Sequence, residues 1–148
     1  MVRDYKDLNV WQMSMELCEK VYGLVRGFPT EERFALADQL RRAAVSIPSN
    51  IAEGNGRNSR TEYARFLSIA RGSVSEVRTQ LELAERFGYI KVPEEVYETT
   101  HSISKMLFAM IQKLSVPSSP PSPPRSHAPI PDSQSPIPSS QFPIPNSP

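Results

Sequence analysis

One helical face of apolar side chains continues across a proline. Leu36, Leu40, Ile47 and Ile51 recur at the spacing of helix turns, and Pro48 lies between the last two. An interior proline removes a backbone hydrogen bond and costs a helix about 3 kcal/mol, so it either kinks the helix or stops it. If the helix stopped at Ile47, nothing would keep Ile51 in register. The pattern therefore predicts a helix that is kinked at Pro48 but continuous.

This proline also frees a backbone group, because the carbonyl of Ala44 loses its usual amide partner. Three short polar side chains nearby are candidates to satisfy freed backbone groups: Ser46, Ser49 and Asn50. We expect the helix to begin at Thr30, an N-cap residue followed by two acids, and to run to about Glu53, where Gly54 ends it.

The chain predicts three further helices. In the first, over residues 8–25, spacings of four and three place one apolar stripe on a single face: Trp11, Met15, Cys18, Tyr22 and Val25. The next covers residues 61–87, with Ser59 as its N-cap and Gly88 after its end. The last begins at Pro93 and ends before Pro117.

Proline usage divides the chain into two parts. Twelve of the fifteen prolines lie in residues 117–148, together with nine serines and only two charged residues. Such a segment cannot bury enough apolar surface to offset its ordering entropy. We therefore predict a folded domain over residues 5–116 and a disordered, Pro/Ser-rich tail over residues 117–148. Four amphipathic helices with short joints predict an all-α, antiparallel up-down-up-down four-helix bundle.

The tail has its own repeat, in which Pro-Ile-Pro recurs every seven residues from Pro129. It is interpreted either as a translated tandem DNA repeat or as a polyproline II ligand for an aromatic groove. In the folded part, some apolar residues lie off the main stripes: Val10, Met13, Leu17 and Leu24 in the first helix, and Ile69, Leu83 and Phe87 in the third. They suggest subunit contact, or are scattered surface residues.

Residues for catalysis or metal binding are scarce. Cys18 is the only cysteine, and the apolar stripe on which it falls indicates a buried thiol. His101 has no second histidine or cysteine at metal-ligand spacing, and the other histidine, His127, lies in the tail. We therefore predict no enzyme activity, no metal and no cofactor. Without an apolar run of about 18 residues or a leader pattern, the expected location is cytoplasmic, with no membrane partner.

Positive charge gathers in the middle of the folded part. All eight basic residues of residues 41–86 are arginines, against five acidic residues. On an ideal helix Arg60, Arg71 and Arg78 fall within about 20° of one another. Arginine forks suit phosphate or carboxylate, so the candidate nucleic-acid-binding residues are Arg41, Arg42, Arg57, Arg60, Arg71 and Arg78. The alternative is that these arginines pair with glutamates on a solvated surface.

Longer stretches of the sequence resemble a known family. They are DLNVWQMSMELCEKVYGL at Asp7–Leu24, LRRAAVSIPSNIAEGNGR at Leu40–Arg57, EYARFLSIARGSVSEVRTQLELA at Glu62–Ala84 and GYI at Gly88–Ile90. Together they resemble the bacterial four-helix bundle proteins that are encoded by intervening sequences of 23S ribosomal RNA genes. The similarity covers about residues 5–115, and RRAAVSIPSNIAEG is its specific signature. The tail has no counterpart in the family.

The resemblance implies a homopentamer. A related branch, the accessory proteins of diversity-generating retroelements, presents a basic surface to nucleic acid and contacts a reverse transcriptase. Two hypotheses follow. The chain is either an oligomeric bundle that binds structured RNA or other nucleic acid through the arginines, or a protein-binding scaffold whose arginines form intersubunit salt bridges.

Overall fold

A computed structural model describes residues 4–116 as helices joined by short turns, with no β-strand in that range. The four long helices are α1 (Asn9–Val25), α2 (Leu36–Asn55), α3 (Arg60–Arg86) and α4 (Glu94–Ser115). Short 3₁₀ turns at Tyr5–Asp7 and Thr30–Glu32 precede α1 and α2. The predicted tail and its repeats lie outside the described residues.

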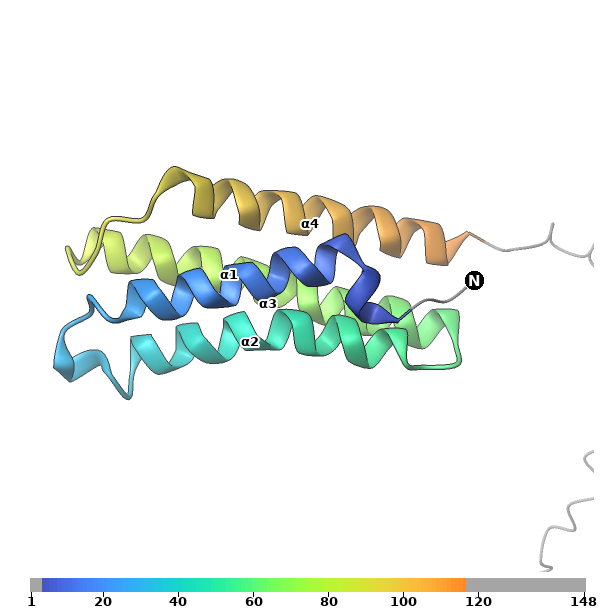
Figure 1. Ribbon diagram of the computed structural model, residues 1–148, viewed down its shortest axis with the longest axis horizontal. Coiled ribbons are helices and arrows are strands. Elements are labelled where there is room, and N and C mark those ends of the chain that lie inside the picture. The colour runs from blue at the N-terminus through green and yellow to red at the C-terminus, as the bar shows by residue number, and fades with distance from the viewer. Residues whose placement is uncertain (1–3, 117–148) are drawn as a thin grey trace, which may run out of the picture. The chain divides into compact units, whose positions relative to one another are not determined.

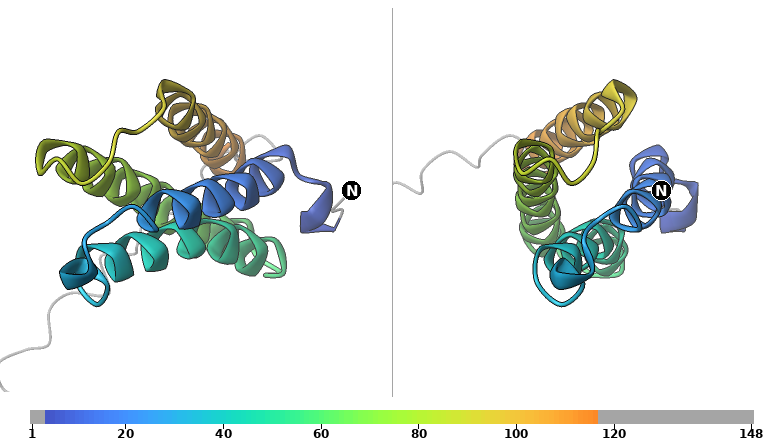
Figure 2. Two further views of the ribbon diagram at one scale, coloured as in Figure 1. Left: turned by 60° about the vertical axis from the view of Figure 1, so that its left-hand side comes forward. Right: turned by 90° about the vertical axis from the view of Figure 1, so that its left-hand side faces the viewer.

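The helices form a four-membered bundle. Successive helices run in opposite directions along the long axis (Figure 1). α1 and α3 each pack against both α2 and α4, and the end-on view places the four helices at the corners of a square (Figure 2). Their buried apolar faces form one core cluster. The predicted all-α four-helix fold is confirmed.

The core face of α1 lies one position away from the predicted stripe. Its buried side chains are Val10, Ser14, Leu17, Val21 and Val25. Met15 and Tyr22, which were expected in the core, are 40% and 44% exposed. The prediction was wrong because it followed apolar residues alone, and Ser14 is a polar residue at a core position. Its hydroxyl donates to the carbonyl of Val10 at 2.6 Å, so the buried side chain is satisfied within its own helix.

The start of α2 also differs from the prediction. Thr30 opens only a 3₁₀ turn, and α2 begins at Leu36, because Ala35 has non-helical angles of φ −117° and ψ −108°. The carboxylate of Glu32 accepts the amide hydrogen of Leu36 at 3.1 Å, so an acid takes the role expected of Thr30. The hydroxyl of Tyr89, in the α3–α4 loop, donates to the other oxygen of Glu32 at 3.0 Å.

The predicted continuity of α2 across Pro48 is confirmed, since the helix reaches Asn55. The partner of the freed Ala44 carbonyl is not one of the three polar residues predicted. It is Cys18 of α1, whose thiol Sγ lies 3.1 Å from the Ala44 oxygen. Asn50 instead donates to the carbonyl of Ser46 at 2.8 Å.

Gly54 has a different role from the one predicted. It does not end α2 but lies buried inside the last turn, and Gly56 is the C-cap. A Cβ at position 54 would lie 2.8 Å from Cβ of Phe66 and 3.0 Å from Cδ1 of Tyr63, both on α3. The glycine therefore lets α2 and α3 approach closely.

The ends of α3 follow the prediction. The Ser59 hydroxyl accepts from the amide of Glu62 at 3.2 Å, as an N-cap does. At the other end Gly88 has a φ of +77°, and the amide of Tyr89 donates to the carbonyl of Ala84, which closes a Schellman motif. Pro93 is the N-cap of α4, so the helix begins one residue after the predicted start.

Candidate functional site

The six candidate arginines do not form one cluster. Because α2 and α3 run in opposite directions, the start of α2 lies at the end of the bundle where α3 finishes (Figure 1). Arg41 and Arg42 belong to that end, and Arg57 and Arg60 flank the α2–α3 turn at the other end. Arg71 and Arg78 follow along α3, where they line pockets shared with α4.

Arg41 and Arg42 share one acid on their own helix. Nε of Arg42 donates to Asp38 Oδ2 at 3.0 Å, and Arg41 lies 3.9 Å from the other oxygen. Arg41 also donates to the carbonyl of Arg33 at 3.0 Å, which ties it to the turn before α2. The two positive charges are thus partly neutralised, although ion pairs at such exposed positions contribute at most about 1 kcal/mol.

Arg57 belongs to a group that the sequence reasoning missed in part. Its guanidinium pairs with Glu53 at 2.6 Å and lies 5.0 Å from the ring centroid of Phe66. Arg65 lies over the same ring at 4.6 Å and pairs with Glu62 at 3.0 Å. Neither Arg65 nor Phe66 is among the site residues predicted from the sequence. The signal that could have found this pair is that an arginine directly precedes a phenylalanine, at Arg65 and Phe66, soon after Arg57 in the sequence.

Arg60 is bound to the end of α4. Its guanidinium donates to the carbonyls of Lys113 and Val116, at 2.8 and 3.2 Å. These carbonyls have no amide partner of their own within α4, because they lie in and after its last turn. Arg60 and Arg57 also line an open pocket of about 440 Å³ at the α2–α3 turn, together with Asn55, Asn58, Ser59 and Tyr63. Burial raises the pKa of Tyr63, which keeps its hydroxyl protonated.

Arg71 faces α4 without an acid. Nε donates to the hydroxyl of Ser104 at 3.3 Å, and the guanidinium lies 4.8 Å from the ring centroid of Phe108. Within residues 4–116 no carboxylate oxygen comes within 4.0 Å of it.

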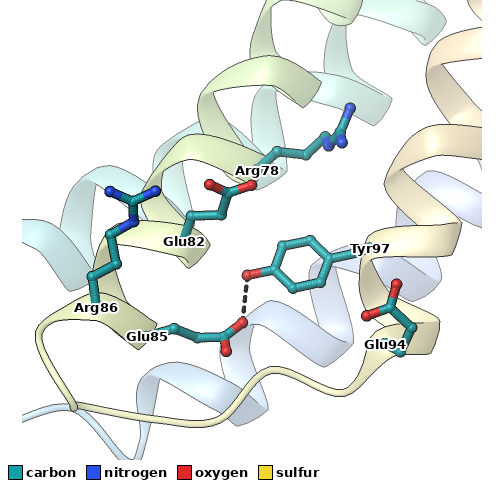
Figure 3. A pocket seen from close by; sticks show the side chains of 6 residues that line it. All are labelled: Arg78, Glu82, Glu85, Arg86, Glu94 and Tyr97. Carbon is teal, nitrogen blue, oxygen red and sulfur yellow. Dashed lines mark hydrogen bonds between the residues drawn. The ribbon is translucent and has the colours of Figure 1, made fainter.

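Arg78 lines a pocket of about 430 Å³ in which acids outnumber bases (Figure 3). The other lining residues are Glu82, Glu85, Arg86, Glu94 and Tyr97. Tyr97 reaches across from α4, and its hydroxyl donates to Glu85 at 2.5 Å. Burial and this hydrogen bond raise the pKa of Tyr97. The three glutamates make this the least favourable of the arginine positions for an anion.

In the described part of the chain, no three His, Cys, Asp or Glu side chains come together as a metal site would require. Within the same residues no helix is long and apolar enough to cross a membrane. The exposed arginines and the pockets beside them present guanidinium, hydroxyl and amide groups, which can bind an anionic partner.

Comparison with known proteins identifies the fold and the family. The structure resembles the crystal structure of a protein of unknown function from the S23 ribosomal protein family of Bacteroides thetaiotaomicron, with a TM-score of 0.64 and 28% identity. That match covers 70% of this chain and 95% of the other. No curated protein matches the chain. The model of the family described as 23S rRNA-intervening sequence protein matches residues 6–111. This match runs from the turn before α1 into α4 and includes the segment around Pro48, and the chain therefore belongs to the 23S rRNA-intervening sequence protein family.

Proposed function

We propose that this protein is a non-enzymatic, oligomeric helical bundle that binds the backbone of structured RNA, or of another nucleic acid, through arginines of α2 and α3. The observation that carries the proposal is the arrangement of Arg57 and Arg65 over the ring of Phe66. A guanidinium that lies over an aromatic ring is held in place, so less freedom is lost when it binds a phosphate.

The surroundings of this pair support the same proposal. Arg57 lines an open pocket together with Arg60, Asn55, Asn58 and Ser59, so further hydrogen-bond donors lie next to its guanidinium. Glu53 and Glu62 pair with the two arginines at the surface. Exposed pairs of this kind are weak and are screened by salt, so a phosphate can compete with them. Arginine forks match phosphate geometry, and phosphate contacts carry no sequence information, which favours backbone contact.

The test is RNA binding by fluorescence anisotropy at several salt concentrations. The variant Arg57→Gln/Arg65→Gln removes both cations and leaves Arg60 to hold the end of α4. We expect weaker binding and a salt slope that is smaller in magnitude by about one to two, since each phosphate contact contributes about 0.7–0.9. Arg26→Gln, an exposed arginine after α1, is the matched control and should bind normally. Equal salt slopes for wild type and the double variant would contradict the proposal.

A second candidate function is a protein-binding scaffold, for which a reverse transcriptase is the partner that the family resemblance suggests. It is favoured by apolar side chains left exposed on α2 and α3, among them Val45 at 42% and Ile69 at 41%. For either candidate function we propose that such residues form subunit contacts, with a pentamer as the expected assembly. Native mass spectrometry of Val45→Lys/Ile69→Lys tests this. A smaller particle supports the contact, and an unchanged mass contradicts it.

A further inference from the structure

A second pocket lies between α3 and α4, halfway along the bundle, and it is lined by an arginine and by serine hydroxyls. Its volume is about 390 Å³. Three serine hydroxyls from the two helices line it, Ser68, Ser75 and Ser104, together with Arg71, Gly72 and Phe108. No carboxylate belongs to the lining, whereas three glutamates line the pocket of Arg78.

Arg71 is held in place at this pocket with most of its donors unused. Its Nε–H bonds to Ser104 Oγ at 3.3 Å, and Phe108 supports the guanidinium at 4.8 Å. An arginine carries five N–H donors, and the hydrogen bonds of residues 4–116 use one of them here. By contrast, Arg42 bonds to Asp38 of its own helix, and Arg57, in the α2–α3 turn, bonds to Glu53 of α2. Arg71 is therefore a positioned cation whose natural counter-charge is not supplied by its neighbours.

Gly72 follows Arg71 and leaves this side of the pocket open. It lies in the middle of α3, where glycine is disfavoured relative to alanine. Gly54 has a packing reason to be glycine, but a Cβ at position 72 would meet no atom within 4 Å. No close contact within the described residues therefore requires a glycine at position 72. Gly72 does, however, border the pocket, and the missing side chain leaves space next to Arg71.

We propose that the Arg71 pocket binds a phosphate group, with the guanidinium as the cation and the serine hydroxyls as hydrogen-bond donors. Arg–phosphate pairs are charge-assisted and frequently bidentate, which suits a guanidinium with free N–H groups. A phosphate oxyanion can come from two sources. One source, which rests on the proposed function, is the backbone of RNA. The other source is free inorganic phosphate.

The experiment follows the side-chain Nε–H signal of Arg71 and the amide of Gly72 by NMR. One titration uses inorganic phosphate and the other a short RNA hairpin. Both ligands should shift these two signals, and Arg71→Gln should weaken RNA binding about fivefold. Gly72→Leu places a side chain in open space at the pocket and should weaken binding similarly while the helix content stays the same. Gly23→Leu is the matched control, because a Cβ at Gly23 also meets nothing within 4 Å.

The outcomes separate this inference from the proposed function. If RNA binds through Arg57 and Arg65 but tolerates both Arg71→Gln and Gly72→Leu, the pocket inference is overturned and the function stands. If inorganic phosphate shifts the Arg71 signal but RNA does not bind, the pocket is supported and the nucleic-acid function fails. If neither ligand shifts the signal in the wild-type protein, the inference is overturned.

Discussion

The thiol of Cys18 donates to the carbonyl of Ala44 at an Sγ–O distance of 3.1 Å, and this carbonyl is the one that Pro48 deprives of its amide partner. A local defect in α2 is thereby converted into a tertiary contact with α1. A buried acceptor without a partner costs about 1–3 kcal/mol, so the thiol offsets part of the cost of the proline. The lone cysteine and the lone helical proline of the bundle serve a common structural purpose.

The first prediction tests this coupling with a double-mutant cycle. Cys18→Val keeps a similar volume and removes the donor, so it should lower the free energy of unfolding by about 1–2 kcal/mol. Pro48→Ala restores an amide for the Ala44 carbonyl. In that background Cys18→Val should cost about 1 kcal/mol less, as measured by urea denaturation. Additive effects of the two substitutions would mean that Cys18 and Pro48 are independent.

The second prediction concerns the ionisation of the same thiol. Burial, and to a smaller extent the nearby charge of Glu19, raise the pKa of Cys18 from 9.0 to about 11. At neutral pH we therefore expect slow reaction with a disulfide reagent in the folded protein, and fast reaction after denaturation in urea. Fast reaction of the folded protein at pH 7 would contradict the raised pKa of this half-buried thiol.

The same raised pKa makes stability depend on pH in a defined window. Below pH 9 the thiol is protonated in both states. Between pH 9 and 11 the unfolded chain loses this proton while the folded protein keeps it, so the free energy of unfolding falls as the pH rises. Cys18→Ser lacks this titration. From pH 8 to pH 10.5, the free energy of unfolding of the wild type should therefore fall relative to that of Cys18→Ser.

The elements that the sequence predicted correctly are those with a strong local signal. The helical phase from Leu40 to Ile51 outweighs the proline, and helix continuity follows. Ser59 and Gly88 mark the ends of α3 because capping and a positive φ depend on a few neighbouring residues. The number and order of the helices follow from such signals.

The errors arise where a polar residue lies at a core position or where a distant residue supplies the partner. Ser14 shifted the predicted stripe of α1, because its hydroxyl is satisfied by Val10 and this cannot be seen in the pattern of apolar residues. The partner of Ala44 lies 26 positions away, at Cys18. Three of the candidate arginines, Arg60, Arg71 and Arg78, were grouped by helical angles, which place them on one face. The angles do not reveal that each meets a different part of α4.

The third prediction concerns Gly54. On helix propensity alone, Gly→Ala in a helix stabilises by about 0.5–1 kcal/mol. At Gly54 the new methyl would lie 2.8 Å from Cβ of Phe66, so we expect a loss of about 1–3 kcal/mol from overpacking between α2 and α3. Gly23→Ala, in open space on α1, should show the gain instead. Thermal denaturation of the two variants should therefore shift the melting temperature in opposite directions, and a higher melting temperature for Gly54→Ala would refute the packing role.

The fourth prediction separates the structural role of Arg60 from its role in binding. Arg60 donates to the carbonyls of Lys113 and Val116, so Arg60→Met should loosen the last turn of α4 and cost about 1 kcal/mol. Hydrogen exchange should rise at residues 111–116 and stay unchanged at the start of α4. Arg57→Met should leave this exchange unaltered, since Arg57 lies in the α2–α3 turn and bonds to Glu53 of α2. If Arg60→Met weakens RNA binding without faster hydrogen exchange at residues 111–116, Arg60 acts on the ligand directly. If exchange at these residues is faster, the loss of binding is assigned to the loosened end of α4.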